Sequence, residues 1–246
     1  MATEPRFRHF ETVGSTNDIA LELARAGEPE GLVITADSQT EGRGRRGRAW
    51  RDEPGQSIIM SAILRPAISA SEMPKLSFVA SLAVAEWLVA ECGLTCELKW
   101  PNDVLVGDRK LAGILVELSL SSGKHAAVAG IGVNVNQRGF PDDLSESATS
   151  LAIETGQSYD VPALTKSLAG HVFAVYERFL ASGFEGILAD WRKYMWGIGT
   201  QVEVASEGRS LAEVIRGVDE SGALLVEDAR GRLHEIHAAD AVRTMQ

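Results

Sequence analysis

The chain has 246 residues, 45% of them hydrophobic and 24% charged, with a formal net charge of −10 at pH 7. These proportions are typical of a globular protein and argue against disordered and fibrous chains, while the acidity argues against broad, nonspecific nucleic-acid binding. We expect no membrane span, since the longest uncharged apolar stretch ends at Glu86. An N-terminus without an apolar core and two isolated cysteines, Cys92 and Cys96, predict a reduced cytoplasmic setting.

The first half of the chain predicts helices and strands in alternation, followed by a meander. Ser15 and Asp18 form a capping-box pattern, so a helix begins there. Residues 32–37 and 57–64 predict strands, and the helical spacing of apolar residues over 74–91 predicts a core-facing helix. Short apolar runs separated by turns then predict antiparallel strands, at 97–100, 104–106, 111–118 and 126–136.

The remaining residues predict helices and then an appended barrel. Asp160 and Pro162 open a helix, and residues 184–196 predict another. Beyond Gly197, about fifty residues form short apolar runs joined by Ser/Gly or Arg/Gly turns, which favours a small β-barrel. We therefore expect two domains, a catalytic domain over 1–196 and a barrel over 197–246.

Positive charge is concentrated in one glycine-rich segment, 42–51, whose arginines are Arg43, Arg45, Arg46, Arg48 and Arg51. Arginine presents planar, forked donors that suit carboxylate and phosphate groups. The spacing of Gly42, Gly44 and Gly47 formally matches a dinucleotide fingerprint, but no helix follows it, so we reject a Rossmann site. We expect a mobile loop that closes over an anionic ligand. A solvated basic loop and an RNA-binding Arg/Gly tract stay open as alternatives.

Three further motifs carry polar residues at turns or strand ends. Lys99-Trp-Pro-Asn-Asp103 surrounds a proline turn and is equally compatible with an ordinary turn. Lys110 opens an apolar strand, where a lysine either extends its stem toward solvent or presents a cation. Glycines inside the strand that begins near Gly130 mark a bulge or the close approach of a ligand. The histidines and cysteines form no set with metal-ligand spacing, so no metal site is expected.

Taken in order, these motifs resemble biotin protein ligase, also called biotin–[acetyl-CoA-carboxylase] ligase. The resemblance rests on Ser15-Thr-Asn17, Gln39 with Gly42–Trp50, Lys99–Asp103, Lys110–Glu117 and Gly130–Asn134. It covers residues 14–136, and the C-terminal β segment extends it to nearly the whole chain. It implies an α+β fold, with a mixed, mainly antiparallel sheet, helices packed on one side of it, and a small SH3-like β-barrel. Because the first motif begins at Gly14, we expect the ligase-only form without an N-terminal DNA-binding domain.

The same resemblance implies an ATP-dependent ligase that forms biotinyl-5′-AMP, with Mg²⁺ on the triphosphate, and transfers biotin to a lysine. The implied partner is the biotin carboxyl carrier domain of a biotin-dependent carboxylase, with no DNA or membrane partner and a monomer or homodimer in the cytoplasm. Rival interpretations are a lipoate or octanoate protein ligase and a non-enzymatic biotin- or RNA-binding protein.

The resemblance also implies roles for individual residues. It assigns to biotin Ser15, Thr16, Asn17, Gln39, Gly42, Arg43, Lys110, Gly113 and Gly130. It assigns to the nucleotide Arg45, Arg48, Trp50 and Asn134. The implied catalytic residues are Lys110, Asp103 and Arg45. A carboxylate and a phosphate 4 Å apart repel by ~4 kcal/mol at an effective dielectric of about 20, and Lys110 between them removes this repulsion. Whether Asp103 acts as a base, a metal contact or a turn residue stays open.

Overall fold

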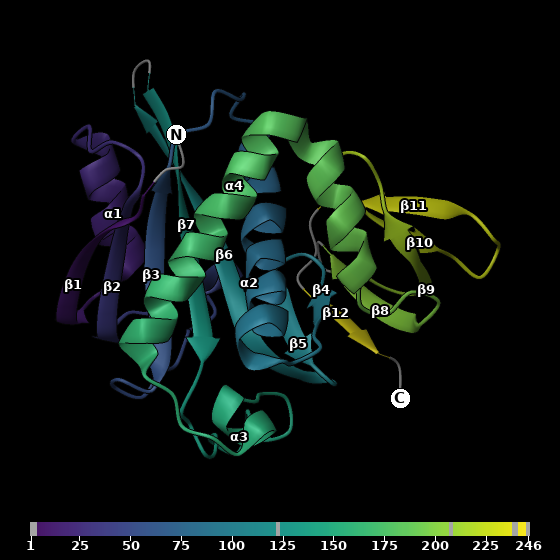
Figure 1. Ribbon diagram of the computed structural model, residues 1–246. Coiled ribbons are helices and arrows are strands. Elements are labelled where there is room, and N and C mark those ends of the chain that lie inside the picture. The colour runs from purple at the N-terminus through teal and green to yellow at the C-terminus, as the bar shows by residue number, and fades with distance from the viewer. Residues whose placement is uncertain (1–3, 122–123, 207–208, 238–240, 245–246) are drawn as a thin grey trace.

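A computed structural model describes residues 4–121, 124–206, 209–237 and 241–244. Within them, a seven-stranded sheet has the strand order β1-β2-β3-β7-β6-β5-β4, and a five-stranded sheet has the order β11-β10-β9-β8-β12 (Figure 1). The first sheet contains β1 (Arg6–Val13), β2 (Leu32–Gln39), β3 (Ser57–Leu64), β4 (Glu97–Lys99), β5 (Asp103–Val106), β6 (Arg109–Ser121) and β7 (Lys124–Asn134). The second contains β8 (Gln201–Ser206), β9 (Arg209–Val218), β10 (Leu224–Glu227), β11 (Leu233–Ile236) and β12 (Ala241–Thr244). The α-helices are α1 (Thr16–Arg25), α2 (Leu76–Cys92), α3 (Leu151–Thr155) and α4 (Val161–Trp191).

Different helices cover the two faces of the first sheet. Val33 of β2 belongs to the large core that includes α2 and α4, whereas its neighbours Leu32 and Ile34 pack with α1. Successive strand residues point to opposite faces, so α1 lies on the face opposite α2 and α4. The expectation that the helices pack on one side was therefore wrong. Helix α1 connects β1 to β2, which pair in parallel, and a parallel connection must cross over the sheet.

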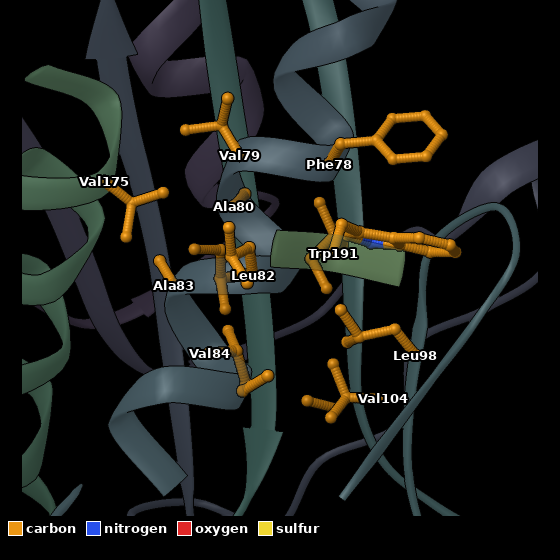
Figure 2. Close-up of a cluster of buried hydrophobic side chains, with 14 of the residues drawn as sticks. Phe78, Val79, Ala80, Leu82, Ala83, Val84, Leu98, Val104, Val175 and Trp191 are labelled. Carbon is orange, nitrogen blue, oxygen red and sulfur yellow. The ribbon is translucent and has the colours of Figure 1, made fainter. Parts of the chain in front are cut away.

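Helix α2 is the central element of the large core. Figure 2 shows its side chains Val79 and Leu82 beside Val175 of α4, with Leu98 of β4 below Trp191. The segment Met73–Cys92 is long and apolar enough to cross a membrane by length and composition, a test that the sequence analysis expected no segment to pass. In this fold 67% of its most apolar window is buried, as befits a helix packed between a sheet and another helix.

Several element boundaries differ from those predicted. The two helices expected on either side of residue 184 are confirmed, because α4 is interrupted at Gly183 by non-helical backbone with φ +73° and ψ −173°; the second of them ends at Trp191, earlier than the predicted residue 196. Strand β1 was missed because its side chains are charged and mostly exposed, so it carries no alternating apolar signal. The short α3 and the final β12 were also missed, whereas the strands predicted within 32–136 are present.

The C-terminal sheet forms the SH3-like unit and shares its core with the first sheet. Val202 and Val204 of β8 are buried in the same cluster as α2. In that cluster the ring centroids of Phe78 in α2 and Trp191 in α4 lie 4.9 Å apart. The indole N–H of Trp100 donates a hydrogen bond to the carbonyl of Gly222, 2.9 Å away, between β9 and β10. The domain boundary expected between residues 196 and 197 stays a prediction.

Candidate active site

A cavity of about 580 Å³ lies over the α1 face of the first sheet, where α1 no longer covers the strands. The floor of the cavity consists of rows of residues that are paired across neighbouring strands. Gly130 of β7 stands between Ser61 of β3 and Leu115 of β6, and the next row pairs Gly132 with Gly113. Glycines on one face of the two adjacent strands β6 and β7 leave room for a ligand close to the backbone.

Hydrogen-bonding side chains from α1 and β2 form one end of this cavity, and Ser61 of β3 supports them from behind the lining. The Thr16 hydroxyl and backbone N–H both donate to Oε1 of Gln39, at 3.1 and 2.8 Å. The fully buried Ser61 hydroxyl lies 2.7 Å from Oγ1 of Thr16 and 2.6 Å from Oδ1 of Asn17. The Asn17 amide donates to Glu117 at 2.7 Å. This network holds the polar groups in fixed orientations, as recognition of a small ligand requires.

Two glycines of β7 have no space for a side chain. A Cβ at Gly130 would lie 2.3 Å from Oδ1 of Asn17, and a Cβ at Gly132 would lie 2.6 Å from the ring of Trp50. The Trp50 indole therefore rests directly on the floor. Its ring N–H is buried and has no hydrogen-bond partner among the residues that the structure describes, so a ligand acceptor there would satisfy it.

A β-bulge determines where Lys110 points. Residues three apart in a regular strand project to opposite faces, which would place Lys110 away from Gly113. The register of β5 and β6 shifts between Val104 and Leu105, and such a bulge redirects side chains. Nζ of Lys110 accordingly lies 3.1 Å from a Cβ placed at Gly113. It forms an ion pair with Oδ1 of Asp103 at 2.6 Å.

The arginine-rich segment forms a short loop across the cavity. The Trp50 N–H donates to the Gly42 carbonyl at 2.9 Å, and the Gly44 N–H donates to the Arg48 carbonyl at 2.7 Å. Arg46 has a φ of +55°, a conformation tolerated in tight turns. Because residues 46–49 are exposed, the tip of this loop faces solvent.

Arg43, at the N-terminal end of this loop, forms ion pairs with two acidic side chains outside the loop. Its guanidinium donates to both carboxylate oxygens of Asp18, each at 2.6 Å, and lies 3.4 Å from Oε2 of Glu117. The hydrogen bonds from Arg43 hold the pKa of Asp18 below its usual range. The Arg43 side chain is thus matched by protein carboxylates, a pairing that the sequence analysis did not predict.

Arg45 instead points toward the turn that precedes β5. Its guanidinium lies 3.5 Å from Oδ1 of Asn102. Burial lowers its pKa, and the neighbouring charge of Arg46 lowers it further. A partly desolvated guanidinium that forms no ion pair with the residues described by the structure is costly, and an anionic ligand would offset that cost.

The cavity brings together most of the predicted site residues: Ser15, Thr16, Asn17, Gln39, Arg43, Arg45, Arg48, Trp50, Asp103, Lys110, Gly113 and Gly130. Asn134 is not among its lining residues, and its buried amide donates to the Thr149 carbonyl at 2.9 Å. Gly42 is buried behind the lining, where a Cβ would lie 2.7 Å from the Trp50 carbonyl. The proposed ligand roles of all these residues stay predictions.

Sequence reasoning missed three supporting residues outside the cavity lining, which hold Asn17 and Arg43 in place: Ser61, Asp18 and Glu117. A lone hydroxyl in the otherwise apolar stretch 57–64 was the available signal for Ser61, and Glu117 stood at the end of a motif already noted. Among the described residues, no group of three or more histidine, cysteine, aspartate or glutamate side chains could hold a metal ion.

Comparisons with known proteins agree with this geometry. Residues 9–134 match the model of the biotin/lipoate A/B protein ligase family. A bifunctional ligase/repressor of Bacillus spizizenii is 36% identical over 98% of this chain and 75% of its own length. A biotin–[acetyl-CoA-carboxylase] ligase of Paracoccus denitrificans is 36% identical over 89% of this chain and 92% of its own. The solved structure of a biotin protein ligase of Aquifex aeolicus in complex with biotin and ATP superposes on this chain with a TM-score of 0.85 and 28% sequence identity. The match covers 98% of this chain and 99% of the Aquifex chain.

Proposed function

The chain belongs to the biotin/lipoate A/B protein ligase family. We propose that the residues of its cavity bind biotin and ATP, catalyse formation of biotinyl-AMP, and then catalyse transfer of biotin to a lysine of a carrier protein. The chain is an ATP-dependent biotin protein ligase. The observation that supports the residue assignments is the ion pair between Lys110 and Asp103, which the bulge in β6 positions at one end of the cavity. A network of hydrogen-bonded side chains lies at the other end.

Biotin enters the end formed by Ser15, Thr16 and Gln39, which Ser61 supports from behind through its hydrogen bond to Thr16. Its ureido group presents both hydrogen-bond donors and an acceptor, and these side chains offer hydroxyl and amide partners. Its apolar ring and tail then lie over the Gly130 floor, where no side chain intervenes. This arrangement directs the carboxylate toward Lys110.

The first reaction is displacement at the α-phosphorus of ATP. A carboxylate oxygen of biotin attacks, the bond to the bridging oxygen breaks, and pyrophosphate leaves with that electron pair. Lys110 and Arg45 stabilise the negative charge, and charge neutralisation with positioning supplies most of the catalysis in phosphoryl transfer. Mg²⁺ arrives with ATP as part of the substrate. The unpartnered indole N–H of Trp50 suits contact with the nucleotide.

The second reaction transfers biotin from the adenylate to a lysine of a carrier protein. The amine must be neutral to attack the acyl carbon, and Asp103 beside Lys110 is placed to accept its proton. The partner is the biotin carboxyl carrier domain of a biotin-dependent carboxylase, and the reaction takes place in the cytoplasm without DNA.

The decisive experiment measures pyrophosphate release from ATP with biotin, lipoate, octanoate or no acid. We expect release with biotin alone, followed by biotinylation of an added carrier domain detected by mass spectrometry. Equal release with lipoate would support the lipoate ligase alternative. No release with any acid would leave a binding protein.

Replacement of Ser61 tests the biotin end of the cavity. Ser61→Ala removes the hydroxyl that donates a hydrogen bond to Oδ1 of Asn17. Leaving a buried acceptor unsatisfied costs about 1–3 kcal/mol. We expect the KM for biotin to rise about tenfold, while the KM for ATP changes less than twofold. Ser119→Ala, which removes another buried hydroxyl outside the cavity lining, is the control. A biotin KM unchanged in Ser61→Ala would remove Ser61 from the site.

Limited trypsin digestion tests closure of the loop. Residues 46–49 are exposed, so we expect cleavage after Arg46 and Arg48 without ligand and at least fivefold slower cleavage with biotinyl-AMP. Cleavage after Arg43 should be slow in both states because its side chain is held by Asp18. Cleavage after the exposed Arg230 in the C-terminal sheet provides an internal reference. Loop cleavage that is equally fast with and without ligand would show that the loop does not close.

A further inference from the structure

The main chain of Lys110 is held by a segment outside the regular sheet. Strand β7 pairs with β6 only from Ala112 onward, so Lys110 lies beyond the edge that β7 covers. Residues 147–149 take the place of β7 there. The Lys110 N–H donates to the Ser147 carbonyl at 2.8 Å, and the Thr149 N–H donates to the Lys110 carbonyl at 2.9 Å. Since a bulge disrupts the strand ladder locally and Lys110 lies at the bulge of β6, these two hydrogen bonds fix its main chain.

A single carboxylate, that of Glu154 in α3, connects this segment to the residue that precedes Lys110. Its Oε1 accepts a hydrogen bond from the Thr149 hydroxyl at 2.5 Å and another from the Arg109 guanidinium at 2.7 Å. Thr149 is fully buried, and the Glu154 side chain is only 17% exposed. Hydrogen bonds to an ionised group are stronger than those between neutral groups, so Glu154 fixes both Arg109 and the segment that pairs with Lys110.

Two further hydrogen bonds anchor this segment to the end of β7 and the loop that follows it. The buried Asn134 amide donates to the Thr149 carbonyl at 2.9 Å, and the buried Ser150 hydroxyl donates to the Gln137 carbonyl at 2.5 Å. The side chains of Asn134, Thr149, Ser150 and Glu154 do not line the active-site cavity. They therefore reach a bound substrate only through the residues that do.

We propose that Thr149 and Glu154 are positioning residues, which act on the reaction through Lys110. Glu154 holds the 147–149 segment against the main chain of Lys110, and the main chain determines where the ammonium lies. This assignment rests on the proposed ligase reaction, in which that ammonium lies between the carboxylate of biotin and the α-phosphate of ATP. A misplacement of about 1 Å can lower the rate of a reaction about 10²-fold, so loss of this support should affect the chemical step more than substrate binding.

The test removes the Thr149 hydroxyl at nearly constant size by Thr149→Val. Pyrophosphate release in a single turnover at saturating biotin and ATP should slow about tenfold, whereas the KM for biotin should change less than about twofold. Thr149→Ser keeps the hydroxyl and should stay within about twofold of the wild-type rate. The matched control is Thr165→Val, which removes a buried hydroxyl that donates to a carbonyl within α4 and should leave the rate unchanged. An equal loss in Thr165→Val, or no loss in Thr149→Val, would overturn the proposal.

Two further measurements show whether the effect passes through Lys110. In the Lys110→Ala background, Thr149→Val should slow adenylate formation by less than about twofold, because residues that act through one group are not additive, and a further loss of about tenfold would overturn the proposal. Exchange of the Lys110 amide hydrogen, followed by NMR without substrates, should be at least about tenfold faster in Thr149→Val. Unchanged exchange would also overturn the proposal. If the wild-type protein releases no pyrophosphate with biotin, the ligase assignment fails, and the exchange rate alone decides whether Thr149 holds Lys110.

Discussion

Lys110→Ala is expected to reduce biotinyl-adenylate formation by at least a hundredfold while leaving the fold intact. In the proposed reaction the ammonium lies where the carboxylate of biotin approaches the α-phosphate of ATP, and removing one preorganised charge-stabilising group costs about 10²–10³ in rate. The measurement is single-turnover release of pyrophosphate at saturating biotin and ATP. Thermal unfolding should change little, since about a third of the Lys110 side chain is exposed and a partly exposed ion pair contributes little to stability.

Lys166→Ala serves as the control for loss of a positive charge, and it should retain the wild-type rate. Lys110→Arg separates charge from position, because its forked guanidinium cannot occupy the place of a compact ammonium. We expect it to recover only part of the activity. A Lys110→Ala protein that kept half of the wild-type rate would exclude Lys110 from the reacting end of the cavity.

Asp103→Asn should slow biotin transfer to the carrier lysine by at least roughly tenfold, since general-base assistance typically contributes 10²–10⁴-fold. The amide preserves the size of the side chain but removes its charge. Because Asp103 also holds Nζ of Lys110 at 2.6 Å, adenylate formation should fall too, though by a smaller factor. Preformed biotinyl-AMP mixed with carrier protein isolates the transfer step.

The pH dependence distinguishes a base from a positioning group. A free lysine amine has a pKa near 10.4, so raising the pH supplies more neutral acceptor and should partly restore transfer by Asp103→Asn. Asp108→Asn, a carboxylate at the turn between β5 and β6 that also lines the cavity, is the control for charge. Slow adenylation with normal transfer would instead assign Asp103 to the nucleotide, and no change in either step would make the 100–103 turn structural.

Local signals in the sequence were sufficient for the family, the fold class and most of the cavity lining. The arginine–glycine segment indicated an anion site because five cations in a short stretch of an acidic chain are unusual. The start of α1 was predicted at the right place, but the expected capping box is absent: Ser15 makes no side-chain capping hydrogen bond, and the Asp18 carboxylate accepts from Arg43 instead. Strands β2, β3 and β7 were predicted because their apolar runs are continuous and they are buried on both faces.

Contacts between distant residues were decided only by the tertiary structure. Arg43 was assigned to biotin, yet the packing of α1 beside the loop gives it Asp18 as its partner, 25 positions earlier in the chain. Asn134 shares a motif with the floor glycines but hydrogen-bonds Thr149. The side of the sheet covered by α1 also could not be derived, since the apolar stripe of a helix does not specify which face of the sheet it covers.

The sequence by itself determined which residue types the site contains, because turns, helix starts and apolar periodicity are properties of neighbouring residues. The tertiary structure alone decided where Lys110 points. Its position three residues before Gly113 predicts opposite faces of a regular strand, and the shift in the β5–β6 register places them on the same face. A bulge depends on how two strands pair, so the orientation of Lys110 was fixed only by the packing of β5 beside β6.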